Sequence, residues 1–246
     1  MSKLVVTATW NDVPHLTDEQ KAELWEAIPP YQRDARSKGI PQLGSGAIYP
    51  VPESDIIEEP FDIPAWWPRS YGMDVGWNMT AVVWGARDPE TDTVHIYAEY
   101  GRGQAEPASH AAAIRARGDW MMGTIDPASR GRQQNDGTQL LQSYRDLGLN
   151  LTPAEHAVEA GLFTVYQRMT TGRFKVFKGL QGWWSEFRLY RRDEKGNVVK
   201  KQDHFMDATR YFVVSGLALG LQAPDYLARM GHGSGVQSEY SPWGAV

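Results

Sequence analysis

The chain contains no cysteine, no long hydrophobic run and no excess of positive charge. Without cysteine it can form neither disulfide bonds nor thiolate metal sites, which fits a reducing compartment. No segment approaches the roughly 18 apolar residues of a membrane span, and the start, MSKLVVTATWNDV, lacks the long apolar region of a secretory signal. Because the formal charge is −5, any contact with nucleic acid must come from a local basic patch.

The first quarter of the sequence is rich in proline. We expect a strand over residues 4–9 and a helix over 17–28, with Thr17 as its N-cap and Gln20 in the capping-box position. Eight prolines then occur at positions 29, 30, 41, 50, 52, 60, 64 and 68, as in an irregular connector. We therefore assign residues 1–67 to an N-terminal extension or linker.

From residue 68 the pattern becomes that of a compact α/β domain, and 41% apolar residues are enough for a core. Three strand-like runs are joined by short turns, as in an antiparallel meander, and then helices alternate with strands. The predicted strands cover 70–75, 80–86, 93–100, 122–126, 149–152 and 174–177, and the predicted helices cover 107–117, 138–147, 154–171 and 203–221. We place this domain at 68–222, followed by a flexible tail at 223–246.

Three carboxylates occur at related places in this pattern. Asp74 lies in the first strand of the meander, Asp126 ends the first strand that follows a helix, and Asp207 is in the first turns of the last helix. Ionised carboxylates beside apolar residues are costly, and converging acids repel one another. A divalent cation relieves both problems, and Asp oxygens are hard ligands suited to Mg²⁺ or Mn²⁺.

Each acid also has an ordinary structural interpretation. Asp74 and Asp126 can serve as turn residues, and Asp207 can be a first-turn acid favoured by the helix dipole. Asp203 suits the N-cap of the last helix better than a metal ligand, although it stays a further ligand candidate. His204 is expected to pack beside the ligands rather than to bind metal. The coincidence of the three aspartates with one strand order favours the metal site.

A basic cluster lies just before Asp207, around a hairpin predicted at residues 195–197. Such a charge run is often only a solvated surface, but its position next to the aspartates makes phosphate contact an equal alternative, independent of base sequence and sensitive to salt. Its members are Arg188, Arg191, Arg192, Lys195, Lys200 and Lys201. Arg130 and Arg132 are weaker candidates.

Aspartates on strand one, strand four and the final helix resemble the ribonuclease H superfamily. The segments GMDVGWNMTAVVWG, GTIDPASRG, TGRFKVFKG and DHFMDATRYFV resemble the nuclease domain of the large terminase subunit of tailed bacteriophages, and VTATWNDVPHL resembles the end of its ATPase region. The resemblance spans about residues 5–221. It implies a ribonuclease H-like mixed sheet, a three-stranded antiparallel meander plus parallel strands, flanked by helices. No G-x-x-x-x-G-K-[ST] motif occurs, so the phosphate-binding loop of the ATPase is missing.

The resemblance implies a metal-dependent endonuclease that cuts concatemeric viral double-stranded DNA, with Asp74, Asp126 and Asp207 as catalytic acids. Two Mg²⁺ or Mn²⁺ ions about 4 Å apart, bridged by an aspartate such as Asp74, would activate water and stabilise the leaving oxygen. The expected partners are DNA, the terminase ATPase region, the small terminase subunit and the portal protein. The expected location is the cytoplasm of the infected bacterium, transiently at the procapsid portal, with no membrane association.

Two other classes stay open. An actin-like or sugar-kinase ATPase also places an Asp before Gly in a strand hairpin, but it needs a second such hairpin and a glycine-rich adenosine motif, which this sequence lacks. A non-catalytic docking module of a packaging motor would keep the fold without cleavage, and the retention of all three acids speaks against it.

Overall fold

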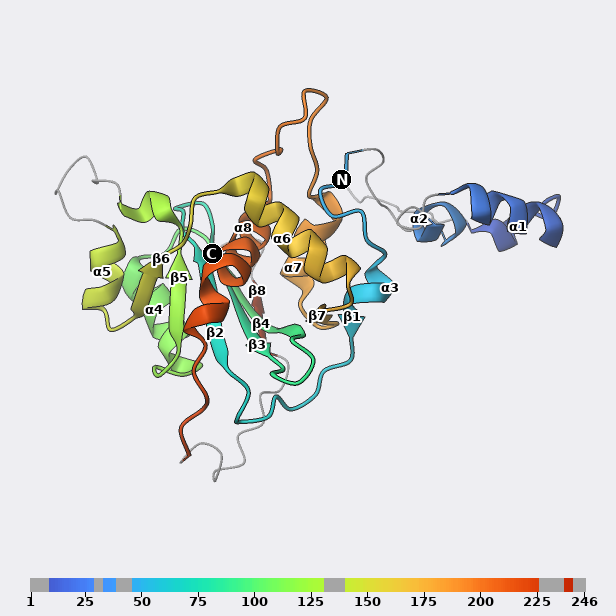
Figure 1. Ribbon diagram of the computed structural model, residues 1–246. Coiled ribbons are helices and arrows are strands. Elements are labelled where there is room, and N and C mark those ends of the chain that lie inside the picture. Colours follow the sequence, from blue (N-terminus) through green and yellow to red (C-terminus); the bar gives the residue numbers. More distant parts are fainter. Residues whose placement is uncertain (1–8, 29–32, 39–45, 131–139, 226–236, 241–246) are drawn as a thin grey trace.

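A mixed β-sheet forms the centre of the protein, as a computed structural model describes it for residues 9–28, 33–38, 46–130, 140–225 and 237–240. Its strands follow the order β1-β7-β4-β3-β2-β5-β6, and β8 pairs with β4 (Figure 1). Their bounds are β1 Ile57–Glu58, β2 Arg69–Asp74, β3 Thr80–Arg87, β4 Val94–Arg102, β5 Met122–Ile125, β6 Asn150–Pro153, β7 Phe174–Phe177 and β8 Gln237–Tyr240.

The predicted meander is confirmed. Strands β2, β3 and β4 are antiparallel neighbours, whereas β5, β6, β7, β1 and β8 join the sheet by parallel pairing. Almost every residue of β3 and β4 is buried, because both faces of the sheet are covered. The sheet is therefore the mixed, helix-flanked one that the sequence predicts.

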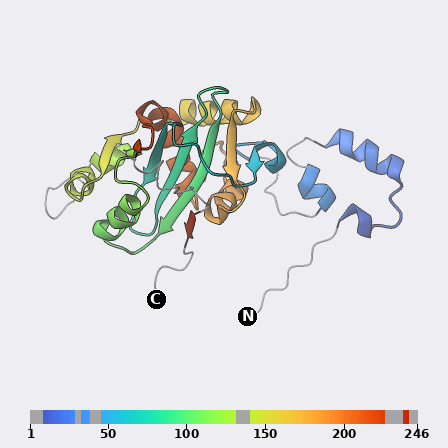
Figure 2. The ribbon, with the colours of Figure 1, turned by 90° about the horizontal axis from the view of Figure 1, so that it is seen from below.

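Helices α6 and α8 cover one face of the sheet, and α4 lies on the other (Figure 2). The helix bounds are α1 Asp18–Ala27, α2 Arg33–Lys38, α3 Glu53–Ile56, α4 Pro107–Ala116, α5 Leu140–Asp146, α6 Val158–Thr170, α7 Gln181–Leu189 and α8 His204–Tyr211. The last predicted helix changes pitch: after Tyr211 it continues as a π-helix over Phe212–Gly216 and a 3₁₀ turn over Leu217–Leu219.

The proline-rich connector is more structured than its sequence indicates. Ile56, Ile63 and Trp67 are buried in the core, and β1 extends the sheet by pairing in parallel with β7. A two-residue strand between prolines carries no alternating pattern, so nothing in the sequence announces it. The predicted Thr17 cap is confirmed, with Gln20 completing the capping box. Residues 4–8 of the predicted first strand lie outside the described residues.

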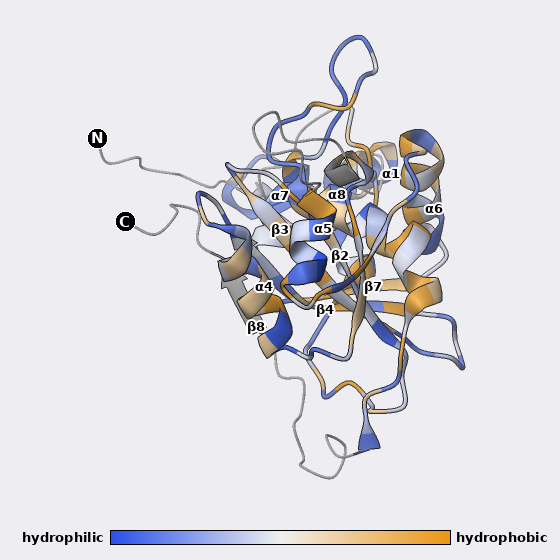
Figure 3. Cartoon of the chain, turned by 90° about the vertical axis from the view of Figure 1, so that its left-hand side faces the viewer, coloured by the Kyte–Doolittle hydropathy of each residue, from blue (hydrophilic) through white to orange (hydrophobic). Residues whose placement is uncertain are grey.

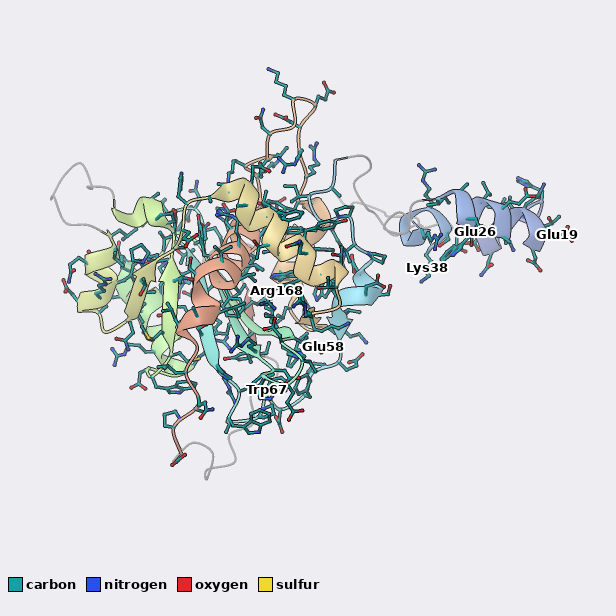
Figure 4. All side chains as sticks on the ribbon, in the orientation of Figure 1. Glu19, Glu26, Lys38, Glu58, Trp67 and Arg168 are labelled. Carbon is teal, nitrogen blue, oxygen red and sulfur yellow. The ribbon has the colours of Figure 1, made fainter. Side chains whose placement is uncertain are left out.

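Helices α1 and α2 stand apart from the sheet. Glu19, Glu26 and Lys38, labelled in Figure 4, lie on these helices, whereas Glu58 and Trp67 lie on the body that contains the sheet. The C-terminal tail also differs from expectation, because Gln237–Tyr240 pairs with β4 as strand β8. Its polar sequence, QSEY, has no strand-like apolar alternation, and the pairing is supplied by the part of β4 from Ala98 to Gly101, beyond the residues that pair with β7.

Two glycines allow α8 and its π-helical extension to lie directly on the meander. A Cβ atom at Gly72 of β2 would come within 2.1 Å of the Ala208 carbonyl oxygen. A Cβ atom at Gly85 of β3 would come within 2.1 Å of the Phe212 ring. The glycines therefore set how closely the helix that carries Asp207 approaches the strand that carries Asp74.

We expect Gly72→Ala to destabilise the protein by about 2 kcal/mol or more, because the added methyl group meets backbone and overpacking of this kind costs 1–3 kcal/mol. A matched control is Gly196→Ala, where no atom lies within 4 Å and only the positive φ of 84° resists substitution. Thermal melting of both variants tests this. Equal melting temperatures for the two would contradict a close contact between α8 and β2.

Candidate metal centre

Asp74 is the last residue of β2, where the strand reaches the edge of the sheet. Its carboxylate is largely buried, and the Oδ2 atom lies 2.9 Å from Nδ1 of His204 at the start of α8. Burial raises the pKa of Asp74, the hydrogen bond from His204 opposes this, and the negative charges of Asp207 and Asp126 raise the pKa further. The charges of Asp126 and Asp207 therefore act on Asp74.

Asp126 follows β5, which pairs in parallel with β2, so both strands end at the same edge. The Asp126 backbone N–H donates to the Met73 carbonyl at 3.0 Å, which places the residue beside Asp74. Its Oδ1 atom accepts bonds from the Ala128 N–H at 2.9 Å and from the Tyr211 hydroxyl at 3.2 Å. The turn that Asp-Pro predicts is thus present, and its carboxylate also contacts the last residue of α8.

Asp207 lies in the first turn of α8 and is buried between two cations. Lys200 Nζ lies 2.8 Å from its Oδ2 atom, and an Arg210 guanidinium nitrogen lies 2.9 Å from its Oδ1 atom. Burial alone would lower the pKa of Lys200, but the hydrogen bond and charge of Asp207 outweigh burial and raise it. Lys200 and Arg210 supply the positive charge that a buried carboxylate requires.

Of the two residues expected beside the three aspartates, His204 behaves as the sequence predicts and Asp203 does not. His204 contacts Asp74 and its pKa is raised, first by that hydrogen bond, as expected of a residue beside the ligands. Asp203 occupies the N-cap position of α8, but its side chain makes no capping hydrogen bond. It lies instead 3.1 Å from Lys200 Nζ, because its backbone is not in the extended conformation of a capping residue.

In the described part of the chain, no three His, Asp or Glu side chains lie close enough together to hold a metal ion. The contacts explain this arrangement: His204 engages Asp74, Tyr211 engages Asp126, and Lys200 with Arg210 engages Asp207. The oxygens of the three aspartates are of the right chemical kind for Mg²⁺ or Mn²⁺. Their protein partners would have to give way for a cation to join them.

Glu186 is the acid that the sequence analysis missed. It projects from α7, is 6% exposed, and accepts a hydrogen bond of 2.6 Å from the Phe205 N–H. Burial raises its pKa to about 8, while hydrogen bonds from the first turn of α8 and the charge of His204 oppose the rise. A Glu within WWSEFRL has no spacing relation to Asp207, so only the packing of α7 against α8 reveals it.

The basic cluster is partly neutralised. Arg188 makes a bidentate pair with Glu53 at 2.6 and 2.7 Å, and Arg192 makes one with Glu159 at 2.6 and 3.0 Å. Lys200 pairs with Asp203 and Asp207. Arg191, Lys195 and Lys201 form no ion pair with another described residue, and they belong to the hydrophilic loop that projects from the domain (Figure 3).

The predicted hairpin at residues 195–197 is present as a turn. The Arg192–Val198 bridge closes it, and the Asp193 N–H donates to the Asn197 carbonyl at 2.8 Å. Of the weaker basic candidates, Arg132 lies outside the described residues, and Arg130 ends a 3₁₀ helix that begins at Pro127.

Residues 71–215 match the family described as terminase RNaseH-like domain. The chain is 33% identical over 221 residues to the large terminase subunit of Salmonella phage P22; the match covers 85% of this chain and 44% of that protein. The chain thus spans less than half the length of this relative.

Solved structures agree with the fold. The chain resembles the nuclease domain of the P22 large terminase with a TM-score of 0.67 and 28% identity, covering 74% of this chain and 97% of that one. It also resembles the large terminase nuclease of thermophilic phage G20c, solved with bound cobalt, with a TM-score of 0.50, 15% identity, and coverage of 69% and 97%. The latter similarity is one of fold alone.

The raised pKa of Glu186 predicts a pH-dependent effect on stability. Its folded-state pKa, about 8, exceeds the ordinary 4.5, so ionisation increasingly destabilises the folded state as pH rises from about 5 to above 8. Glu186→Gln cannot ionise. The melting temperature of this variant relative to wild type should therefore rise between about pH 5 and pH 8 and level off above that.

Glu159→Gln is the control for this experiment. The pKa of Glu159 is lowered, first by its hydrogen bond from Arg192, so this variant should lose a small amount of stability at pH values above the unfolded pKa. A difference between Glu186→Gln and wild type that stays constant from pH 5 to pH 9 would show that Glu186 does not titrate in this range.

Proposed function

Because this chain belongs to the terminase RNaseH-like domain family, we propose that it is a metal-dependent endonuclease that cleaves concatemeric viral double-stranded DNA during genome packaging. The main support is the position of Asp74, Asp126 and Asp207 at one region of the structure, where the charges of the other two raise the pKa of Asp74. Mutual repulsion of this kind is what a bound cation relieves.

The three aspartates would hold Mg²⁺ or Mn²⁺, with Asp203 as a further oxygen ligand. The bound cation would supply Lewis-acid stabilisation of the phosphate and a more acidic water molecule as the source of the nucleophile. The solved G20c nuclease binds cobalt, which supports a divalent ion here as well. No side-chain nucleophile is required, so the chain's own residues need only bind and orient ligand and substrate.

The chain's residues divide this work according to their contacts. His204 holds the Asp74 carboxylate through Nδ1, and Arg210 holds one oxygen of Asp207 from a buried position. Lys200 is more accessible than Arg210, and its ammonium group occupies the other Asp207 oxygen. We propose that Lys200 leaves this Asp207 oxygen free for the cation and contacts the DNA phosphate instead when the site is loaded.

DNA would lie along the projecting loop. Arg191, Lys195 and Lys201 are the basic residues of the cluster that retain uncompensated charge among the described residues, and such charges bind phosphates without regard to base sequence. Arg188, Arg192 and Lys200 contribute less at first contact, because Glu53, Glu159 and the two aspartates already neutralise them.

The proposed setting is a packaging complex in the cytoplasm of the infected bacterium, transiently at the procapsid portal. The proposed partners are the terminase ATPase region, the small terminase subunit and the portal protein. Within the described ranges, no helix has the length and hydropathy needed to cross a bilayer. We propose no membrane association.

We expect Asp74→Asn to abolish plasmid cleavage in Mn²⁺ or Mg²⁺, because it removes a charged ligand and retains the side-chain shape. In wild type, a hundredfold excess of Mn²⁺ over Kd stabilises by about 2.7 kcal/mol and should raise the melting temperature. The variant should melt at or above wild type in EDTA, since one repelling charge is gone, and should lose most of the rise with Mn²⁺.

The exposed Asp62→Asn is the matched control and should cleave and respond to Mn²⁺ as wild type does. Asp74→Asn that cuts normally, or that is still stabilised by Mn²⁺ as much as wild type, would leave Asp74 as an ordinary turn residue. Absence of cleavage by wild type, with intact Mn²⁺ and DNA binding, would instead favour the non-catalytic docking module.

Replacing Arg191, Lys195 and Lys201 together with Ala should weaken DNA binding equally for all sequences and reduce the salt dependence, by up to about 0.9 in log–log slope per lost phosphate contact. Arg188→Ala is the control, because its charge is already paired with Glu53. Fluorescence anisotropy at several salt concentrations measures both. An unchanged affinity and slope in the triple variant would identify the loop as a solvated surface.

A further inference from the structure

The first turn of α8 is held by a side chain from another helix. We propose that Glu186 of α7 is a positioning residue for the metal centre: by accepting backbone hydrogen bonds at the start of α8, it fixes where His204 and Asp207 are presented to Asp74. This inference rests on the proposed function, since it concerns the geometry of the same site.

The start of α8 needs such a partner. The first N–H groups of a helix have no acceptor within the helix and are usually satisfied by the side chain of the N-cap residue. Asp203 is in that position but makes no capping bond, and its carboxylate lies beside Lys200 instead. The N-cap residue has therefore been diverted to the charged cluster, and the helix start requires an acceptor from elsewhere.

Glu186 supplies the acceptor. Its Oε2 atom lies 2.6 Å from the Phe205 nitrogen, and the next N–H group, that of Met206, also acts to lower the pKa of this carboxyl group. These two residues lie directly between His204 and Asp207 in the sequence. Any displacement of the first turn must therefore move the histidine that holds Asp74 and the aspartate that faces Lys200 and Arg210.

The α7 helix is itself fixed to the sheet by the same kind of contact. Glu99 of β4 is fully buried and accepts bonds from the Gly182 and Trp183 N–H groups at 3.0 and 2.7 Å, at the start of α7. A continuous series of contacts thus runs from β4 to the start of α7, and from Glu186 to the start of α8. These contacts fix the position of α8 relative to the sheet that carries Asp74.

A second contact between the two helices provides a control. The Trp183 indole N–H donates to the Thr209 hydroxyl at 2.8 Å, beyond Asp207 along α8. Thr209→Val removes this bond and nearly preserves the shape of the side chain. It also removes the bond that the Thr209 hydroxyl donates to the Phe205 carbonyl at 2.7 Å, but it leaves the bond between the Phe205 N–H and Glu186 in place.

Three variants of the full chain test the proposal: Glu186→Gln keeps an acceptor oxygen at the same reach, Glu186→Asp keeps the carboxyl group but is one methylene shorter, and Thr209→Val is the control. Titration calorimetry gives the Kd for Mn²⁺, and melting gives stability. We expect Glu186→Asp to weaken Mn²⁺ binding about 10-fold, as loss of a residue that orients ligands does, and Glu186→Gln to change it only a few-fold.

Thr209→Val should lower the melting temperature and leave the Kd for Mn²⁺ unchanged. If Glu186→Asp behaves like Thr209→Val, Glu186 has only a structural role and the proposal is wrong. If Glu186→Gln weakens Mn²⁺ binding as much as Glu186→Asp does, the carboxyl group itself rather than the position of the acceptor oxygen matters, which also overturns the proposal.

Amide hydrogen exchange of the wild-type protein provides a readout that needs neither metal nor a folded variant. The Phe205 and Met206 amides should be protected as strongly as amides within α8. Much faster exchange of these two amides would show that Glu186 does not hold the start of the helix. Wild type that binds no Mn²⁺ would refute the proposed function, and the exchange of these two amides would still decide whether Glu186 holds the helix.

Discussion

The structure depends on one constraint: several carboxylates must lie close together in a folded protein. Asp74, Asp126 and Asp207 lie around the edge where β2 and β5 end and α8 begins, and Asp203 and Glu186 lie beside them. Charge repulsion and burial both disfavour this arrangement. Lys200, Arg210 and His204 offset it, each through a direct contact with a carboxylate oxygen.

The contacts that bring these acids together also shape the fold around them. Gly72 and Gly85 let the last helix approach the meander without side chains between, and Phe212 fills the space over Gly85. The helix widens to a π-helix from Phe212, at the point where it packs over both strands. Two buried glutamates then hold the helix starts in place: Glu99 of β4 accepts from the start of α7, and Glu186 of α7 accepts from the start of α8. The catalytic proposal depends on this rigid placement of acids rather than on an activated side chain.

The sequence predicts the parts of the fold that have a regular apolar pattern. The strand from Phe174 to Phe177 is predicted with its observed bounds, and the meander differs from prediction by one or two residues at its ends. Strands β1 and β8 could not be predicted, because each is short, lies at an edge, and owes its formation to an existing strand that offers free backbone groups.

The candidate site is predictable to a similar extent. The three aspartates and His204 stand in recognisable sequence positions, but their partners depend on tertiary packing. The sequence cannot show that Arg188 pairs with Glu53, 135 residues away, or that Arg192 pairs with Glu159, so composition alone does not distinguish the paired from the unpaired members of the basic cluster. Asp203 likewise has the sequence position of a cap, and only its contact with Lys200 explains why Glu186 takes over that role.

The position of a bound cation can be tested by crystal diffraction after soaking with Mn²⁺, with anomalous scattering to locate the ion. We expect manganese bound by oxygens of Asp74, Asp126 and Asp207, with the Lys200 ammonium group displaced from Asp207. Saturating Mn²⁺ that gives no anomalous peak among these aspartates, with Lys200 still bound to Asp207, would contradict it.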